Sequence, residues 1–163
     1  MPVPLPRPIR LFQCYAHKDH GDVQSLVERL KHHLAASTSL RVEIWSDRQI
    51  LIGTAWDQVI KDAMTQAVSG LLLLSPAALA SDYIQRVEIP TLLAASKLLV
   101  VGLRPIDFAT QLPPALKAIQ VFQLKTSGGG ERFYTQCRTR QQKDDFALGL
   151  YQALHNRLAG STP

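Results

Sequence analysis

The chain alternates short apolar runs with segments in which apolar residues recur every three or four positions. The apolar runs predict strands over residues 9–15, 40–45, 70–74, 97–102 and 119–124. The helical spacing predicts helices over residues 23–34, 56–67, 84–95 and 143–158. Strands that alternate with helices predict an α/β, flavodoxin-like three-layer fold, in which a five-stranded, mostly parallel sheet carries helices on both faces.

Polar residues and one proline mark where these helices begin and break. Asp22 precedes the first apolar stripe and is the expected cap of that helix, and Thr54 is the expected cap of the next. Pro90 removes a backbone donor from the third helix, so we expect a kink there or a restart near Ile89. Residues 127–142 are polar and begin with a glycine run, which predicts an irregular excursion before the last helix.

The third apolar run and the carboxylate that follows it are the most informative part of the chain. Four consecutive leucines, residues 71–74, stand between Gly70 and Ser75, which is typical of a strand covered on both faces. Ligands of such sheets bind beyond the carboxyl ends of the strands. Glu88 then falls on a helical face that is otherwise apolar, where a carboxylate is costly unless it has a partner or a task.

Two interpretations of Glu88 stay open from the pattern alone. In the structural one, Glu88 pairs with Arg86 or Lys97, or caps a nearby backbone group. In the chemical one, it hydrogen-bonds ribose hydroxyls and stabilises the oxocarbenium ion that develops when a glycosidic bond breaks. The strand ends that could meet the same ligand are Tyr15, Ala16, Asp19, residues 45–53, Ser75 and Tyr83.

Other chemistries lack residues that they need. His17 and His20 have no second pair of zinc ligands to complete a site, so we expect no metal. The glycine run 128–130 lacks the Lys-Ser/Thr of a phosphate-binding loop. Ser75 has no flanking glycine pattern for a nucleophile elbow, and the third strand has no acidic residue at its end to accept a phosphoryl group.

Length and hydropathy narrow the class of protein. The 163 residues, 46% of them hydrophobic, suffice for one domain, and we expect a leader over residues 1–8, the domain over 9–159 and a tail over 160–163. No uncharged apolar stretch reaches the roughly 18 residues of a membrane span. Residues 1–8 also lack the apolar core of a signal peptide, so we expect a cytoplasmic protein.

Charge and cysteine content add two expectations. The net charge is +5, but the basic cluster Arg132, Arg138, Arg140 and Lys143 has few aromatic residues for base stacking. We therefore do not expect nucleic acid to be bound directly. Two cysteines, Cys14 and Cys137, cannot form a disulfide framework and are expected to be free thiols, with Cys14 in the core.

Three segments follow one another in an order known from one family. They are residues 11–19, residues 44–53 with Trp56 and Ile60, and residues 71–76 with Ser81, Tyr83 and Glu88. Together they resemble a bacterial TIR (Toll/interleukin-1 receptor) domain of the NAD-cleaving type, over about residues 9–158. The first segment is similar to the family's first box, the second to its second strand and BB loop, and the third to the helix with the catalytic glutamate.

The resemblance implies an enzyme, an NAD+ nucleosidase that releases nicotinamide and gives ADP-ribose or cyclic ADP-ribose. It implies NAD+ as the substrate, no further cofactor, and Glu88 as the catalytic residue. The NAD+ contacts that it implies are Tyr15, Ala16, Asp19, Trp45, Asp47 and Arg48. The strand-end positions Ser75 and Tyr83 are expected to contact the same substrate. We expect Trp45 or Tyr83 to pack on a ring of the substrate. Cys14 and Ala16 stand where the family usually has serine.

The resemblance also implies partners. Other TIR domains would bind head to tail, so that the Ile50–Gly53 loop of one molecule completes the pocket of the next. Three aliphatic residues at the tip of this loop favour such a contact independently. We further expect a sensor domain or subunit outside this chain, and a role as effector module in bacterial defence or signalling. The alternatives are a non-catalytic adaptor that binds only TIR domains, and a flavodoxin-like module that binds a nucleotide without turnover.

Overall fold

The computed structural model describes residues 8–46, 56–95 and 97–159. The main sheet has five strands: β1 (Ile9–Cys14), β2 (Val42–Trp45), β3 (Ser69–Leu74), β4 (Leu98–Gly102) and β5 (Val121–Phe122). All neighbouring strands are parallel, in the order β2-β1-β3-β4-β5. This is the flavodoxin-like order, so the predicted fold class is confirmed.

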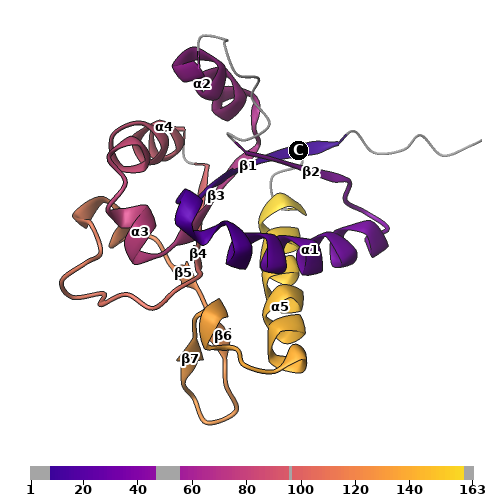
Figure 1. Ribbon diagram of the computed structural model, residues 1–163. Coiled ribbons are helices and arrows are strands. Elements are labelled where there is room, and N and C mark those ends of the chain that lie inside the picture. The colour runs from indigo at the N-terminus through magenta and orange to yellow at the C-terminus, as the bar shows by residue number, and fades with distance from the viewer. Residues whose placement is uncertain (1–7, 47–55, 96, 160–163) are drawn as a thin grey trace, which may run out of the picture.

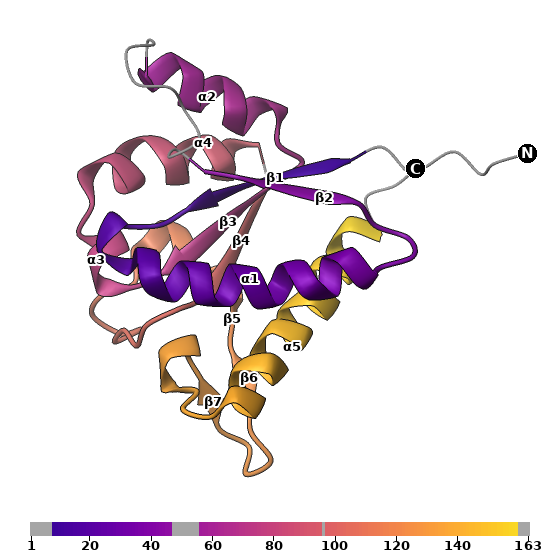
Figure 2. The same cartoon turned by 45° about the vertical axis from the view of Figure 1, so that its right-hand side comes forward.

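Helices cover both faces of this sheet (Figure 1). One face carries α1 (His20–Ala36) and α5 (Arg140–Ala159), and the other carries α2 (Trp56–Gln66), α3 (Pro76–Leu79) and α4 (Ile89–Ala94). Figure 2, turned by 45°, shows the same separation and the long helix α1 running beside the sheet. Each face therefore has its own apolar core.

The four leucines of β3 serve both cores. Leu71 and Leu73 pack in the α1/α5 core, while Leu72 and Leu74 pack in the core under α2 and α4. All four are at most 1% exposed, which confirms that this strand is covered on both faces. The residue before them is Gly70, and α4 lies close to it. A Cβ at this position would lie 2.4 Å from Leu92 Cδ1, so a larger residue would not fit without a shift of Leu92.

The first helix begins earlier than predicted. A 3-10 turn, η1 (His17–Asp19), leads directly into α1 at His20. Asp22 is therefore not the cap but lies in the first turn of α1, where its carboxylate binds Arg104. The cap prediction was wrong because the turn after β1 already starts the helix. The predicted cap Thr54 lies outside the described residues.

The third helix is divided as its proline predicts. Residues Ile84–Glu88 form one π-helical turn, η3, and α4 restarts at Ile89. Pro90 thus stands in the first turn of α4, directly after the π-helical turn, and this irregular turn accommodates its missing backbone N–H. The restart near Ile89 is confirmed, and it places Glu88 at the junction of the two helical segments.

The segment before α5 differs from the single strand predicted over residues 119–124. The parallel strand β5 covers only Val121–Phe122, and β6 (Leu124–Lys125) instead pairs antiparallel with β7 (Glu131–Arg132). Gly129 closes this hairpin with a φ of 85°, a conformation that favours glycine. The glycine run, predicted to begin an irregular excursion, is therefore a hairpin turn.

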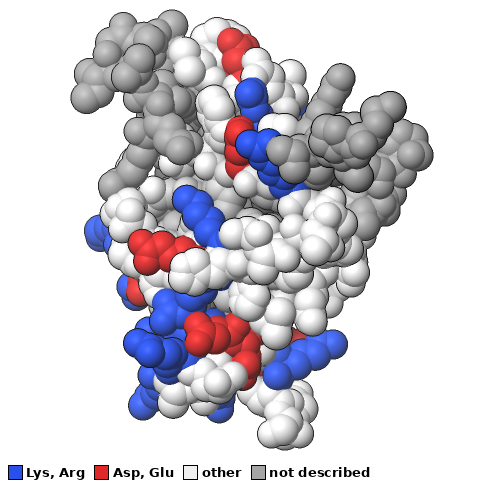
Figure 3. Space-filling model, turned by 90° about the vertical axis from the view of Figure 1, so that its right-hand side faces the viewer, with Lys and Arg blue, Asp and Glu red and all other residues white. Residues whose placement is uncertain are grey.

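The charged surface is mixed in sign. Figure 3 shows that Lys and Arg side chains gather toward one end of this face and that Asp and Glu side chains lie among them. Within the basic cluster, Arg138 and Arg140 are exposed, but the exposed Asp145 follows one turn into α5. The expectation that nucleic acid is not bound directly stays a prediction. No helix in the described part of the chain is both long and apolar enough to cross a membrane.

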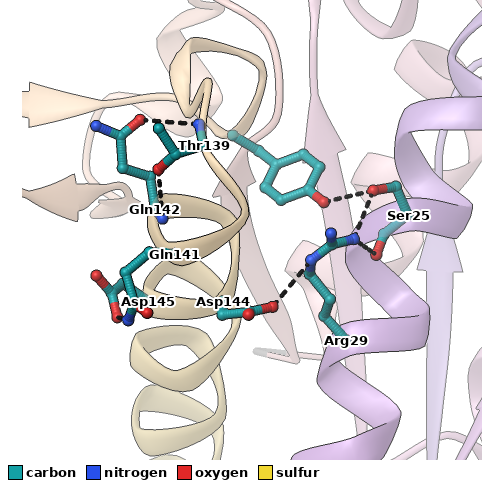
Figure 4. A network of polar contacts seen from close by, with 8 residues as sticks. Ser25, Arg29, Thr139, Gln141, Gln142, Asp144 and Asp145 are labelled. Atoms are coloured by element: carbon teal, nitrogen blue, oxygen red, sulfur yellow. Dashed lines mark hydrogen bonds and ion pairs between the residues drawn. The ribbon is translucent and has the colours of Figure 1, made fainter.

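A polar network fixes the end of the excursion against the helices (Figure 4). The hydroxyl groups of Ser25 and Tyr134 lie 2.6 Å apart, and Arg29 donates 3.0 Å to Ser25 Oγ and 3.1 Å to Asp144 Oδ1. The network thus joins α1, α5 and the 3-10 turn η5 (Tyr134–Gln136).

Burial raises the pKa of the Tyr134 phenol, and it likewise raises the pKa of the nearby Cys137 thiol. Cys14 and Cys137 are both buried thiols.

Candidate functional site

A cavity of about 420 Å³ opens at the carboxyl ends of β1 and β3. The chain leaves β1 toward β2 on one side and returns to β3 on the other, so the sheet reverses its strand order at this point. Such switch points are where open parallel sheets bind ligands. The side chains most relevant to chemistry in its lining are Tyr15, Ala16, His17, Lys18, Tyr83 and Glu88.

Glu88 is the buried charge of this cavity. It is 3% exposed, and the adjoining Ile84 and Ile89, each 4% exposed, anchor its helical segment in the core under α2 and α4. Arg86, one candidate partner, is exposed, and Lys97 Nζ donates to the backbone oxygen of Thr65 at 3.1 Å. Apolar packing thus fixes the helical segment from which the Glu88 carboxylate lines the cavity, an arrangement typical of functional carboxyl groups.

The β1 side of the cavity is aromatic and basic. Tyr15 is 6% exposed, and its hydroxyl group hydrogen-bonds His20 Nδ1 at 3.2 Å. The exposed His17 and Lys18 follow in the η1 turn. Ala16, at a position where the family that the chain resembles usually has serine, contributes a small apolar side chain. Glu88 thus lines the same cavity as the basic residues His17 and Lys18.

Asp19 and Ser75 lie beside this wall but bind each other. Ser75 is fully buried, caps α3 by accepting a hydrogen bond from the Ala78 backbone N–H at 3.0 Å, and donates its own hydroxyl proton to Asp19. Asp19 is 3% exposed and also pairs with Arg104, with Nε 3.1 Å from Oδ1. The two residues therefore join the ends of β1 and β3, and the Ser75–Pro76 pair begins a helix rather than a simple turn.

Trp45 lies elsewhere. It is 36% exposed at the end of β2, with the Arg10 guanidinium carbon 5.0 Å from its ring centroid. It lines a larger cavity of about 700 Å³ between β2 and the carboxyl-terminal half of α1. The structure therefore brings Tyr83, and not Trp45, into the cavity of Glu88. Asp47, Arg48 and the Ile50–Gly53 loop lie outside the described residues.

The cavity at β1 and β3 is the better candidate site, although it is the smaller of these two. It lies at the switch point of the sheet and contains a buried carboxylate, whereas the larger cavity lies along the edge strand. Among the described residues, no three His, Cys, Asp or Glu side chains are grouped to hold a metal ion. The chemistry available here is that of a carboxylate with hydrogen-bonding and aromatic neighbours.

The residues that sequence reasoning missed at this site are His17, Lys18 and Ser81. His17 was considered only as a zinc ligand and Lys18 was not singled out, yet their position directly after Tyr15 and Ala16 was the available signal. Ser81 precedes Tyr83 by two positions at the entry to the π-helical turn. Its backbone oxygen accepts from the Gln85 N–H at 3.0 Å, so it helps to start that turn.

Comparison with known proteins adds one finding. A family model described as TIR domain matches residues 11–138, a segment that includes every described residue assigned above to the cavity. A search of curated proteins found no match.

Proposed function

Because the chain belongs to the TIR domain family, we propose that it is an NAD+ nucleosidase with Glu88 as its catalytic carboxylate. The observation that carries this proposal is the position of Glu88. Its carboxylate is buried by apolar packing, yet it lines a cavity at the carboxyl ends of β1 and β3. A carboxyl group in that setting is available to a substrate and is shielded from competing water.

The proposed reaction breaks the bond between the nicotinamide nitrogen and the ribose. The bonding electron pair leaves with the nitrogen, which neutralises the nicotinamide, and the ribose acquires oxocarbenium character. Glu88 hydrogen-bonds the ribose hydroxyls and stabilises this positive charge. Capture by water, which then loses a proton, gives ADP-ribose. Capture by a nitrogen of the adenine gives cyclic ADP-ribose.

The neighbours of Glu88 suit the rest of the dinucleotide. Tyr83 offers an aromatic ring within the same cavity, and Lys18 offers an ammonium group that can approach the diphosphate. Tyr15 and Ala16 form the adjoining wall. We assign Asp19 and Ser75 a supporting role, since their side chains are engaged with each other and hold that wall in place.

We further propose that activity requires self-association. The Ile50–Gly53 loop of one molecule would complete the Glu88 cavity of the next, and a sensor domain or subunit outside this chain would control the assembly. In this scheme the domain acts as an effector of bacterial defence or signalling. The apolar sequence of the loop tip supports such a contact.

Release of nicotinamide tests the proposal directly. Concentrated protein with a crowding agent is incubated with NAD+, and free nicotinamide is measured by chromatography. Loss of charge stabilisation at the reacting centre is expected to lower the rate of Glu88→Gln by about 100-fold or more. Glu131→Gln, at an exposed glutamate of the β6–β7 hairpin, is the matched control and should retain the wild-type rate. Equal, slow release by the wild type and Glu88→Gln would remove the enzymatic claim.

Calorimetry with intact NAD+ separates the alternatives. A domain that binds NAD+ but releases no nicotinamide is a nucleotide-binding module. A domain that does neither, yet associates with other TIR domains, is an adaptor. Binding followed by Glu88-dependent release supports the nucleosidase.

A further inference from the structure

A second cavity, of about 410 Å³, lies on the other side of Tyr15 from the Glu88 cavity. It is bounded by the ends of β1 and β2 and by one side of α1, where buried and exposed residues alternate. Tyr15 lines both cavities, so one aromatic residue is the wall between them. The side chains that give the second cavity its character are Gln13, His20, Gln24, Glu28 and Ser46, together with Lys31.

Gln13 is the unusual member of this set. It lies on β1 between Leu11 and Tyr15 in the alternation that faces α1, opposite Leu71 in the sheet register. Every neighbour in that alternation is apolar or aromatic. Its side-chain oxygen Oε1 is buried and has no hydrogen-bond partner among the residues that the structure describes. A buried acceptor without a partner is unfavourable, and its presence beside a cavity calls for a donor from outside the chain.

The walls define what kind of donor fits. Val23 and Val27 are buried apolar side chains on α1, and the rings of Tyr15 and His20 lie at 24° to each other with centroids 6.1 Å apart. Apolar and aromatic walls suit a flat ring, while the Gln13 oxygen suits an N–H group at its edge. Glu28 and Lys31 supply one charge of each sign, so the lining does not favour a charged ligand.

We propose that this second cavity binds a flat, uncharged nitrogen heterocycle whose N–H group donates to Gln13 Oε1. The assignment of that ring to one of the two bases of NAD+ rests on the proposed function. The adenine amine carries the required donor, and so does the carboxamide of nicotinamide, whose ring is uncharged once it has left the ribose. Tyr15 then separates a chamber for the reacting ribose at Glu88 from a chamber for a base at Gln13.

Binding of the two fragments tests this without any turnover. Adenosine and nicotinamide are titrated separately into the wild type by calorimetry, because neither contains the bond that the proposed reaction breaks. We expect one of them to bind, Gln13→Leu to weaken that binding at least tenfold, and Glu88→Gln to leave it within twofold. Gln13→Met, which keeps the length of the side chain, should behave as Gln13→Leu does.

Two further readouts decide the outcome. The side-chain amide resonances of Gln13, identified by their loss in Gln13→Met, should shift when the bound fragment is added. Both variants should also melt no lower than the wild type, since they remove a buried acceptor that has no partner. Unchanged fragment binding in both variants, or no binding of either fragment to the wild type, would overturn the proposal. If Gln13→Leu binds the fragment normally while the wild type releases nicotinamide, only the proposal of a base-binding cavity is overturned. If fragment binding depends on Gln13 but the wild type releases no nicotinamide, only the proposed function is overturned.

Discussion

The pair of carboxylates that share Arg104 gives a matched test of how the β1 wall is held. Arg104 binds Asp19, whose side chain is 4% exposed, and Asp22, whose side chain is 34% exposed. Asp19 also accepts the Ser75 hydroxyl proton. Replacement by asparagine keeps the size of each side chain and removes its charge. The two variants therefore alter the same guanidinium at a buried and at an accessible partner.

The expected magnitudes follow from this difference in burial. Asp19→Asn weakens charge-assisted hydrogen bonds away from water, which are worth about 1.5–3 kcal/mol. We expect the lower half of that range, because the Arg104 side chain is 46% exposed and its charge is screened by solvent. Asp22→Asn removes an accessible ion pair worth about 0.2–1 kcal/mol. Asp19→Asn should thus cost about 1–2 kcal/mol more than Asp22→Asn.

Urea unfolding followed by circular dichroism measures both free energies of unfolding at neutral pH. Added salt provides an internal check, since it should reduce the cost of Asp22→Asn more than that of Asp19→Asn. If Asp22→Asn proves as destabilising as Asp19→Asn, the buried carboxylate is not what holds the end of β1 to β3, and the reasoning from burial fails.

Two further substitutions probe packing and alkaline stability. Gly70→Ala should destabilise the protein by about 1–3 kcal/mol, because its Cβ would meet the fully buried Leu92. The control Gly21→Ala places its Cβ in open space and should not destabilise the protein. Equal melting temperatures of the two variants would contradict this packing. Burial raises the pKa of Tyr134, so the unfolded chain loses this proton first and stability should fall as pH rises above the ordinary tyrosine value of about 10. Urea unfolding measures the free energy of unfolding at pH 8 and at pH 10.5. Between these two values it should fall less in Tyr134→Phe than in the wild type or in the control Tyr151→Phe, which changes a half-buried tyrosine. Equal falls in all three proteins would refute the assignment to Tyr134.

The sequence predicted the central elements well because their patterns have one physical explanation each. Four leucines in β3 have no polar face, so a strand covered on both sides was the natural prediction. Pro90 lacks a backbone donor, which confined it to the first turn of a restarted helix. The same pattern placed Glu88 at the end of the preceding turn, beside the crevice.

The sequence predicted less where a choice depends on distant partners. Asp19 and Ser75 were expected to meet the substrate, but each finds the other across the ends of two strands, a pairing that no local pattern encodes. Trp45 was expected near Glu88, but β2 takes the outer edge of the sheet. Gln13 was not among the predicted site residues, although a single amide within an apolar alternation is a signal of one.

The strand order of the main sheet also decides when the Glu88 cavity can exist during synthesis. β1 lies between β2 and β3, and Phe12 of β1 pairs with Gly70 of β3. The strand β3 therefore emerges from the ribosome long after β1. Glu88 emerges later still. The core that α1 shares with α5 is complete only when α5, near the end of the chain, has been synthesised. Contacts this distant in sequence slow folding and leave apolar surface open to chaperones meanwhile. A nascent chain therefore carries Tyr15 long before it can form the cavity that Tyr15 lines with Glu88.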